Sequence, residues 1–175
     1  MRSASRGNDP VRVLVVSAAL WLSACGGVIP AAEAPFPVDP ALTVTQGEVE
    51  RTVFAAELNV VLLAMTRLPT GVYYRDIEEG TGVRVAAGRE VYVRYIASLA
   101  NGTEVDRTAP GGPPLLFKVG DGVVIRGWDL GMRGMRTGGT RQIVVPSRYA
   151  YGTKAVNRVP ANSVMVFVVR LERVR

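Results

Sequence analysis

The chain has 175 residues, 48% of them hydrophobic, and its 21 basic residues outnumber its 15 acidic ones. This length and apolar content predict one domain of ordinary size with extra segments, and they exclude an intrinsically disordered chain. Histidine is absent and there is a single cysteine, which excludes His-dependent catalysts, intrachain disulfides and zinc sites of the usual kinds. The basic residues are scattered singly, so nucleic-acid binding is not expected. No apolar run reaches the roughly 18 residues of a membrane-spanning helix.

The first residues resemble a bacterial export signal. Arginines precede a ten-residue apolar run, Val13–Leu22, which small residues follow, as is typical of a secretory signal peptide. The segment Leu22–Gly26 then resembles the bacterial lipobox, in which the cysteine is acylated and becomes the mature N-terminus. We therefore expect a signal peptide over 1–24 and a lipid anchor on Cys25. An ordinary signal peptide that happens to contain a cysteine is the alternative.

Two further segments precede the regular part of the chain. Residues 25–44 are rich in Pro and Ala and predict a semi-extended tether. Over 45–70 we expect an N-terminal arm, because Thr45–Glu48 matches a capping box and the apolar residues that follow fall near one helical face. Val60–Leu63 is equally compatible with a strand. We expect a short helix followed by an extended arm.

From Gly71 onward, alternating apolar and polar residues predict a succession of short strands. The Asn101-Gly102 pair predicts a tight hairpin turn between two of them. The expected strands cover 72–77, 91–99, 103–106, 115–119, 140–145 and 163–173. One short helix is expected over Val124–Gly131. The sequence therefore predicts an α+β domain over 71–175, in which five or six antiparallel strands wrap around one short helix.

Five motifs in this region resemble, in the same order, those of FKBP-type peptidyl-prolyl cis-trans isomerases. The most specific is Val124–Gly131, which reads VIRGWDLG and resembles the family pattern VIxGWxxG. The other four are Val93–Tyr95, Asn101–Asp106, Tyr149–Gly152 and Val159–Phe167. The resemblance covers Gly71–Arg175 and implies an FKBP-like fold. Residues 65–67 and 71–76 also resemble the arm of lipoprotein members of the family.

The resemblance implies catalysis of rotation about X-Pro bonds. This reaction breaks no covalent bond and needs only to lower the barrier of about 18–20 kcal/mol for rotation about the peptide bond. An apolar, aromatic pocket can assist by removing the imide from water, so no cofactor and no metal are expected. The implied partners are proline-containing unfolded or partly folded polypeptides, macrolide inhibitors, and the membrane through the lipid anchor. A chaperone or peptide-binding module with little or no turnover is the alternative function.

The resemblance also implies the roles of ten site residues. Five would be catalytic: Tyr95, Asp106, Trp128, Tyr151 and Phe167. Five would bind substrate: Val105, Leu115, Val124, Ile125 and Val159. In this reading Trp128 forms the pocket floor, the Ile125 N–H and the Tyr151 hydroxyl bind substrate carbonyls, and Asp106 lies at the rim beside Tyr95. Without the resemblance, Trp128, Tyr95 and Phe167 could equally be core residues.

The sequence departs from the family pattern around this pocket. Val105 and Leu115 stand where phenylalanine is common, so two walls become aliphatic. The loop before Pro160 is one residue shorter than usual, and it carries Arg158 where an aliphatic residue is typical. Ala161 replaces a frequent second proline. We therefore expect the pocket to persist with an altered substrate preference. Export and Gly26 after the cysteine lead us to expect a cell-envelope location, at the outer membrane facing the periplasm if the organism is diderm.

Overall fold

The structure is a computed structural model that describes residues 47–175. The expected signal peptide (1–24), the lipidation site Cys25 and the tether (25–44) lie outside the described residues. So do the first two residues of the expected capping box, Thr45 and Gln46.

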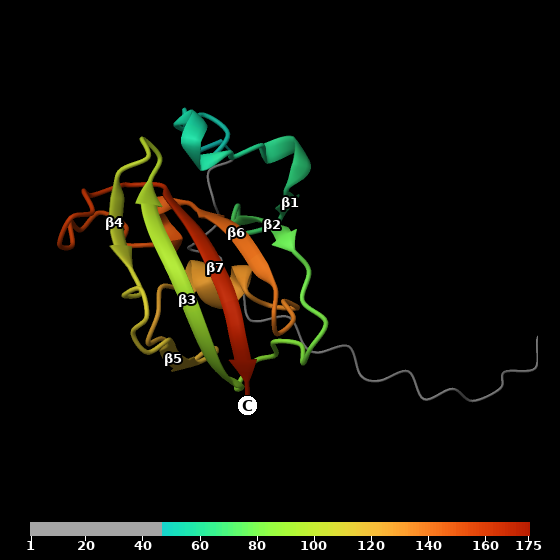
Figure 1. Ribbon diagram of the computed structural model, residues 1–175. Helices are drawn as coiled ribbons and strands as arrows, with labels where there is room; N and C mark the ends of the chain where they lie inside the picture. The colour runs from blue at the N-terminus through green and yellow to red at the C-terminus, as the bar shows by residue number, and fades with distance from the viewer. Residues whose placement is uncertain (1–46) are drawn as a thin grey trace, which may run out of the picture. The chain divides into compact units, whose positions relative to one another are not determined.

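The described chain forms one antiparallel sheet and one short α-helix (Figure 1). The strands are β1 (Thr66–Arg67), β2 (Tyr73–Glu78), β3 (Glu90–Leu99), β4 (Glu104–Arg107), β5 (Leu115–Lys118), β6 (Thr140–Val145) and β7 (Met165–Val174). They lie in the order β1-β2-β6-β7-β3-β4, and β5 also pairs with β3. The helix α1 spans Arg126–Gly131. The predicted α+β class, antiparallel sheet and single short helix are confirmed, and the two-residue strand β1 was not expected.

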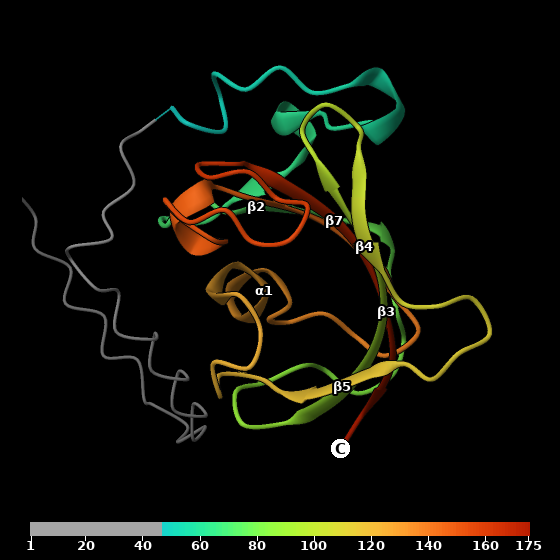
Figure 2. The ribbon, with the colours of Figure 1, turned by 90° about the vertical axis from the view of Figure 1, so that its left-hand side faces the viewer.

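The sheet curves around α1, and the main core fills the space between them (Figure 2). The longest pairing joins β3 to β7, from Val91↔Val174 to Leu99↔Met165. Because successive side chains in a strand point to opposite faces, one face of each of these strands is buried against the helix. The buried residues on that face include Val91, Val93, Ala97, Met165, Phe167, Val169 and Leu171, as the alternation predicted.

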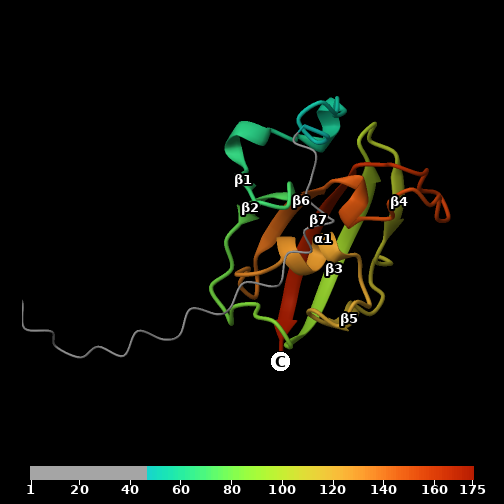
Figure 3. The ribbon, with the colours of Figure 1, turned by 180° about the vertical axis from the view of Figure 1, so that it is seen from behind.

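The helix lies in direct contact with β6, on the concave side of the sheet (Figure 3). Its two glycines make this approach possible. A Cβ atom on Gly127 would collide with the side chain of Val145, and one on Gly131 would collide with Ile143. The absence of a side chain at these two positions therefore sets how deeply α1 is seated, and with it the depth of Trp128.

A buried arginine ties the end of the helix to the sheet. Arg141 of β6 donates to both carboxylate oxygens of Asp76 at 2.7 and 2.8 Å. Its remaining terminal nitrogen donates to the carbonyls of Gly131 and Arg133, each at 2.9 Å. The carbonyls at a helix C-terminus lack partners within the helix, and a guanidinium satisfies them while complementing the helix dipole. The guanidinium also lies 4.3 Å from the ring centroid of Tyr74.

The arm forms no α-helix within its described part, 47–70. It has two 3-10 helices of three residues each, η2 (Ala56–Leu58) and η3 (Leu62–Ala64), and the expected short helix is corrected accordingly. The expected helical face is also wrong, because Val53 is 89% exposed and Leu63 is fully exposed. Asn59 adopts a left-handed conformation that ends η2, which prevents a continuous helix.

The arm covers part of the outer face of the sheet, where it builds a second apolar cluster. The buried members are Val49, Met65, Tyr73, Val144, Val164 and Val166. The arm is also tied to two distant turns by hydrogen bonds. The Ala55 N–H donates to the Ala100 carbonyl at 2.8 Å, and the Glu48 carboxylate accepts from the Ser147 N–H at 3.0 Å. These contacts between residues far apart in the sequence determine the conformation of the arm.

Candidate functional site

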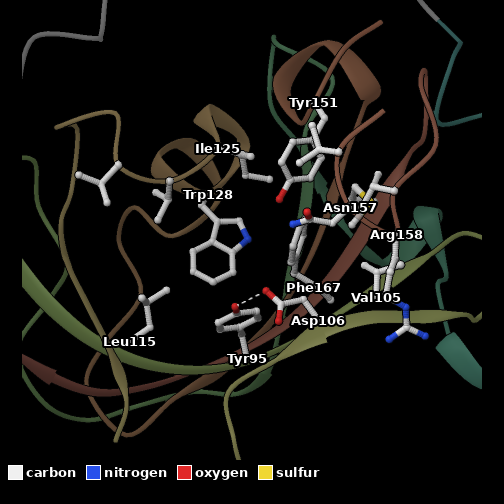
Figure 4. Close-up of a pocket in the computed structure, with 16 residues that line it drawn as sticks. Tyr95, Val105, Asp106, Leu115, Ile125, Trp128, Tyr151, Asn157, Arg158 and Phe167 are labelled. Carbon is white, nitrogen blue, oxygen red and sulfur yellow. Dashed lines mark hydrogen bonds between the residues drawn. The ribbon is translucent and has the colours of Figure 1, made fainter. Parts of the chain in front are cut away.

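One pocket of about 480 Å³ opens on the concave side of the sheet and contains all ten residues that the sequence singled out (Figure 4). The ten are Tyr95, Val105, Asp106, Leu115, Val124, Ile125, Trp128, Tyr151, Val159 and Phe167. They come from β3, β4, β5, β7, the helix and its preceding loop, and the loop after β6. The fold therefore brings together residues that lie up to 72 positions apart in the chain.

The floor of the pocket is the indole of Trp128, on the buried side of α1. It is 3% exposed, and three aromatic rings surround it. Tyr95 and Phe167 meet it nearly edge-on, with centroid distances of 4.9 and 5.4 Å, and Phe117 lies behind at 5.8 Å. Such edge-to-face contacts are favourable and restrict the orientation of the ring. The indole N–H is buried without a hydrogen-bond partner among the described residues, which leaves it available to a ligand.

A tyrosine–carboxylate pair forms one side of the pocket. The Tyr95 hydroxyl donates to Asp106 Oδ2 at 2.5 Å, and Asp106 Oδ1 accepts from the Arg107 N–H at 2.8 Å. Pairing of β3 with β4 brings the two residues together, with Ala97 opposite Asp106. Burial, followed by the hydrogen bond and the charge of Asp106, raises the pKa of the Tyr95 hydroxyl above its usual value. The phenol therefore remains protonated, and the carboxylate remains hydrogen-bonded on both oxygens.

Two hydrogen-bond donors of the pocket have no acceptor among the described residues. The Tyr151 hydroxyl has no hydrogen-bond partner within residues 47–175, and its side chain points into the pocket (Figure 4). Burial, and then the charge of Asp106, raises the pKa of Tyr151, so this phenol also stays protonated. Ile125 immediately precedes α1, and its carbonyl accepts from the Trp128 N–H at 2.9 Å. Its own N–H has no acceptor among the described groups. Together with the indole of Trp128, these groups offer three free donors.

Six further residues line the same pocket and were not among the predicted site residues. They are Ala97, Val123, Val156, Asn157, Arg158 and Met165. Ala97 and Met165 lie on strand faces that the alternation had already placed inward, so this pattern could have identified them. The other four lie in loops, where no periodicity indicates the direction of a side chain.

Comparison with known proteins identifies the family of this chain. The model of the FKBP-type peptidyl-prolyl cis-trans isomerase family matches residues 82–172. The chain belongs to this family. FK506-binding protein 4 of Mycosarcoma maydis is 39% identical over 113 residues, which are 65% of this chain and 30% of that protein. FK506-binding protein 4 of Saccharomyces cerevisiae is 43% identical over 104 residues, 59% of this chain and 26% of that protein. The chain thus spans less than a third of the length of these two relatives.

Two solved structures share the fold of this chain. The crystal structure of FkpA from Escherichia coli superposes with a TM-score of 0.59 at 36% identity, over 64% of this chain and 52% of that one. A peptidyl-prolyl cis-trans isomerase from Pseudomonas syringae pv. tomato gives a TM-score of 0.60 at 28% identity, over 82% of this chain and 98% of that one. The predicted FKBP-like fold is confirmed.

In this FKBP-type domain, the two aliphatic substitutions lie where the resemblance implied. Val105 and Leu115 both line the pocket, on opposite sides of Tyr95 in Figure 4. Across residues 47–175 no group of three acidic or cysteine side chains could hold a metal ion. Within the same range no helix has the length and apolar character needed to cross a membrane.

Proposed function

We propose that this chain is a peptidyl-prolyl cis-trans isomerase of the cell envelope that acts on X-Pro bonds in secreted or envelope proteins. The observation that supports this most is the pocket itself. It combines an aromatic floor, apolar walls and three free hydrogen-bond donors, and its lining contains no cysteine, serine or lysine that could serve as a nucleophile. Such a pocket suits a reaction in which a bond rotates and none is broken.

In the proposed mechanism the proline ring packs on Trp128 between Tyr95 and Phe167. The imide is thereby removed from water. Water stabilises the planar imide, which resonance makes polar, more than the twisted imide, so the barrier to rotation is lower in the pocket. The Ile125 N–H and the Tyr151 hydroxyl hold carbonyls on either side of the proline, so that a single torsion turns. Asp106 acts through its 2.5 Å hydrogen bond to Tyr95, which fixes that ring against the indole.

The location is part of the proposal and rests on the sequence. The charged start, the apolar run and the lipobox-like Leu22–Gly26 support export and lipidation at Cys25. A Pro-rich tether over 25–44 would hold the folded part clear of the bilayer. The isomerase would then meet proline-containing chains as they leave the export machinery, when slow isomerisation can limit their folding.

The aliphatic walls Val105 and Leu115 also suit a second function, a chaperone or peptide-binding module with little turnover. NMR exchange spectroscopy on short proline peptides would distinguish the two, because it measures isomerisation and binding in one sample. We expect catalysed exchange that falls about five- to tenfold in Tyr151→Phe, since a lost hydrogen bond to substrate is worth about 1–1.5 kcal/mol. Peptide binding without exchange enhancement by the wild type would instead support the binding module.

A further inference from the structure

Arg158 lies in the proposed substrate pocket and has no ionic partner there. It lines the pocket together with Val105 and Asp106, and its side chain is exposed to solvent. No described acidic side chain lies within ion-pairing distance of its guanidinium, whereas three exposed arginines of the strands, Arg67, Arg107 and Arg170, each pair with a glutamate. Figure 4 shows the guanidinium at the edge of the pocket beside Val105.

The backbone holds this arginine at a defined position. Val156 and Val159 exchange two backbone hydrogen bonds, at 3.0 and 2.9 Å, which makes Asn157 and Arg158 the two central residues of a tight turn. Asn157, the first of the two, has the positive φ that two-residue hairpin turns favour at this position (51°). The turn is anchored at its base because Val159 is buried in the main core. The side chain of Arg158 therefore starts from a fixed point above the pocket.

Arg158 could alternatively serve only to balance the charge of Asp106, the single acidic residue among the pocket lining. The geometry does not favour that role. Both oxygens of Asp106 already accept hydrogen bonds, from the Tyr95 hydroxyl and from the Arg107 N–H. Lys154 adds a second exposed positive charge to the same loop. The rim on this side is therefore basic, and both carboxylate oxygens of Asp106 already accept hydrogen bonds from donors other than Arg158.

We infer that Arg158 selects substrates that carry an acidic side chain, Asp or Glu, next to the proline. This inference rests on the proposed function, because it assumes that the proline ring occupies the floor at Trp128. A residue adjacent to the bound proline lies about one residue length, roughly 3.3–3.6 Å, from it along the chain. Its side chain would then reach the rim, where Arg158 can pair with a carboxylate without first breaking an ion pair within the protein.

The test compares peptides that differ only beside the proline. Glu, Gln and Lys are placed immediately before or immediately after it, and isomerisation and binding are both measured by NMR exchange spectroscopy. For the wild type at low salt we expect kcat/KM for the Glu peptide to be about two- to fivefold higher than for the Gln peptide. This is the fold-change that corresponds to the energy of a partly exposed ion pair. The Lys peptide should be the poorest. The advantage of Glu should disappear at 1 M salt, where the screening length is about 3 Å.

Variants of the loop assign the preference to one residue. Arg158→Gln should reduce the Glu-to-Gln ratio to about one, and Arg158→Glu should favour the Lys peptide. Lys154→Gln is the matched control, because Lys154 shares the loop but does not line the pocket, and it should keep the preference for Glu. A wild-type ratio of one at both positions, or an unchanged ratio in Arg158→Gln, would overturn the inference.

Failure of the proposed function gives a different result. If the wild type accelerates isomerisation of none of the peptides, the isomerase proposal fails. The dissociation constants of the same peptides still test the role of Arg158. A Glu-to-Gln affinity ratio of two to five that is lost in Arg158→Gln would support it. Equal affinities would contradict it.

Discussion

Replacement of Arg141 by methionine should destabilise the domain more than any exposed arginine substitution. Its side chain is 5% exposed and donates four hydrogen bonds, two to Asp76 and two to the carbonyls at the end of α1. Removal of one member of a buried ion pair costs about 3–5 kcal/mol, because the other charge is left unpaired. The side chain of Asp76 is 26% exposed, so water can solvate part of its charge. This places the expected loss near the lower limit, at about 3 kcal/mol.

Urea denaturation followed by circular dichroism would measure this loss. A change of about 3 kcal/mol in the free energy of unfolding corresponds to a fall of about 10–15 °C in Tm for a domain of this size. Arg94→Met is the matched control, because Arg94 also donates to a carboxylate, Glu172 at 2.6 Å, and to two carbonyls, those of Gly112 and Ala109, but its side chain is about one-third exposed. It should cost about 1–2 kcal/mol, less than Arg141→Met, because water can replace the lost partners.

A double variant separates the unpaired charge from the lost carbonyl contacts. Asp76→Asn added to Arg141→Met removes the unpaired carboxylate and should recover part of the lost stability. If Arg141→Met is instead no more destabilising than Arg94→Met, the buried arginine does not hold α1 to the sheet, and the account of how Trp128 is positioned is refuted.

Four other predictions follow from the site and the sequence. Val105→Phe should tighten binding of a macrolide such as FK506 about tenfold in a calorimetric titration, because one more large apolar contact is worth about 1–2 kcal/mol; equal affinity would show that Val105 does not contact the ligand. Isomerase activity should be nearly flat from about pH 6 to 8, since burial raises the pKa of Tyr95 and of Tyr151 and the chain has no histidine; a bell-shaped profile would contradict this. Burial raises the pKa of Asp129, so its ionised form opposes folding at neutral pH. Asp129→Asn should therefore be more stable than wild type at pH 7 in urea denaturation, with a gain that vanishes as the pH falls below about 4; a gain that persists at pH 3 would have another cause. Cys25→Ser should move the protein from the detergent phase to the aqueous phase or leave it uncleaved; unchanged partitioning would refute lipidation.

The strands and the helix could be predicted from the sequence because their signals are local. Alternation in β3 and β7 identified the buried faces, and the Asn101-Gly102 pair located the hairpin between β3 and β4. Nine of the ten predicted site residues belong to the ordered motifs, Leu115 being the exception. All ten line one pocket, although they are spread between positions 95 and 167 of the chain. The roles of these residues remain proposals.

The arm could not be predicted in the same way. Its apolar residues fit a helical period, yet its conformation depends on acceptors and donors that lie about 45 to 99 residues away, at Ala100 and Ser147. Arg158 is a similar case. Its identity was visible as a departure from the family pattern, but its position at the pocket edge follows from the hydrogen-bonded turn between Val156 and Val159. Long-range contacts determine the conformation of the arm, and turn geometry determines the position of Arg158; neither is indicated by periodicity.

The pairing of β2 with β6 has a practical consequence for expression of this domain. The family match begins at residue 82, after β2 has ended, whereas β6 pairs with β2 from Tyr73↔Val144 to Glu78↔Thr140. A recombinant fragment trimmed to 82–172 would leave β6 as an open edge, with N–H and C=O groups ready to pair with another copy. Loss of the arm would also bring Val144 and Val166 to the surface. Such a fragment should aggregate, and the shortest soluble unit should begin near Gly47.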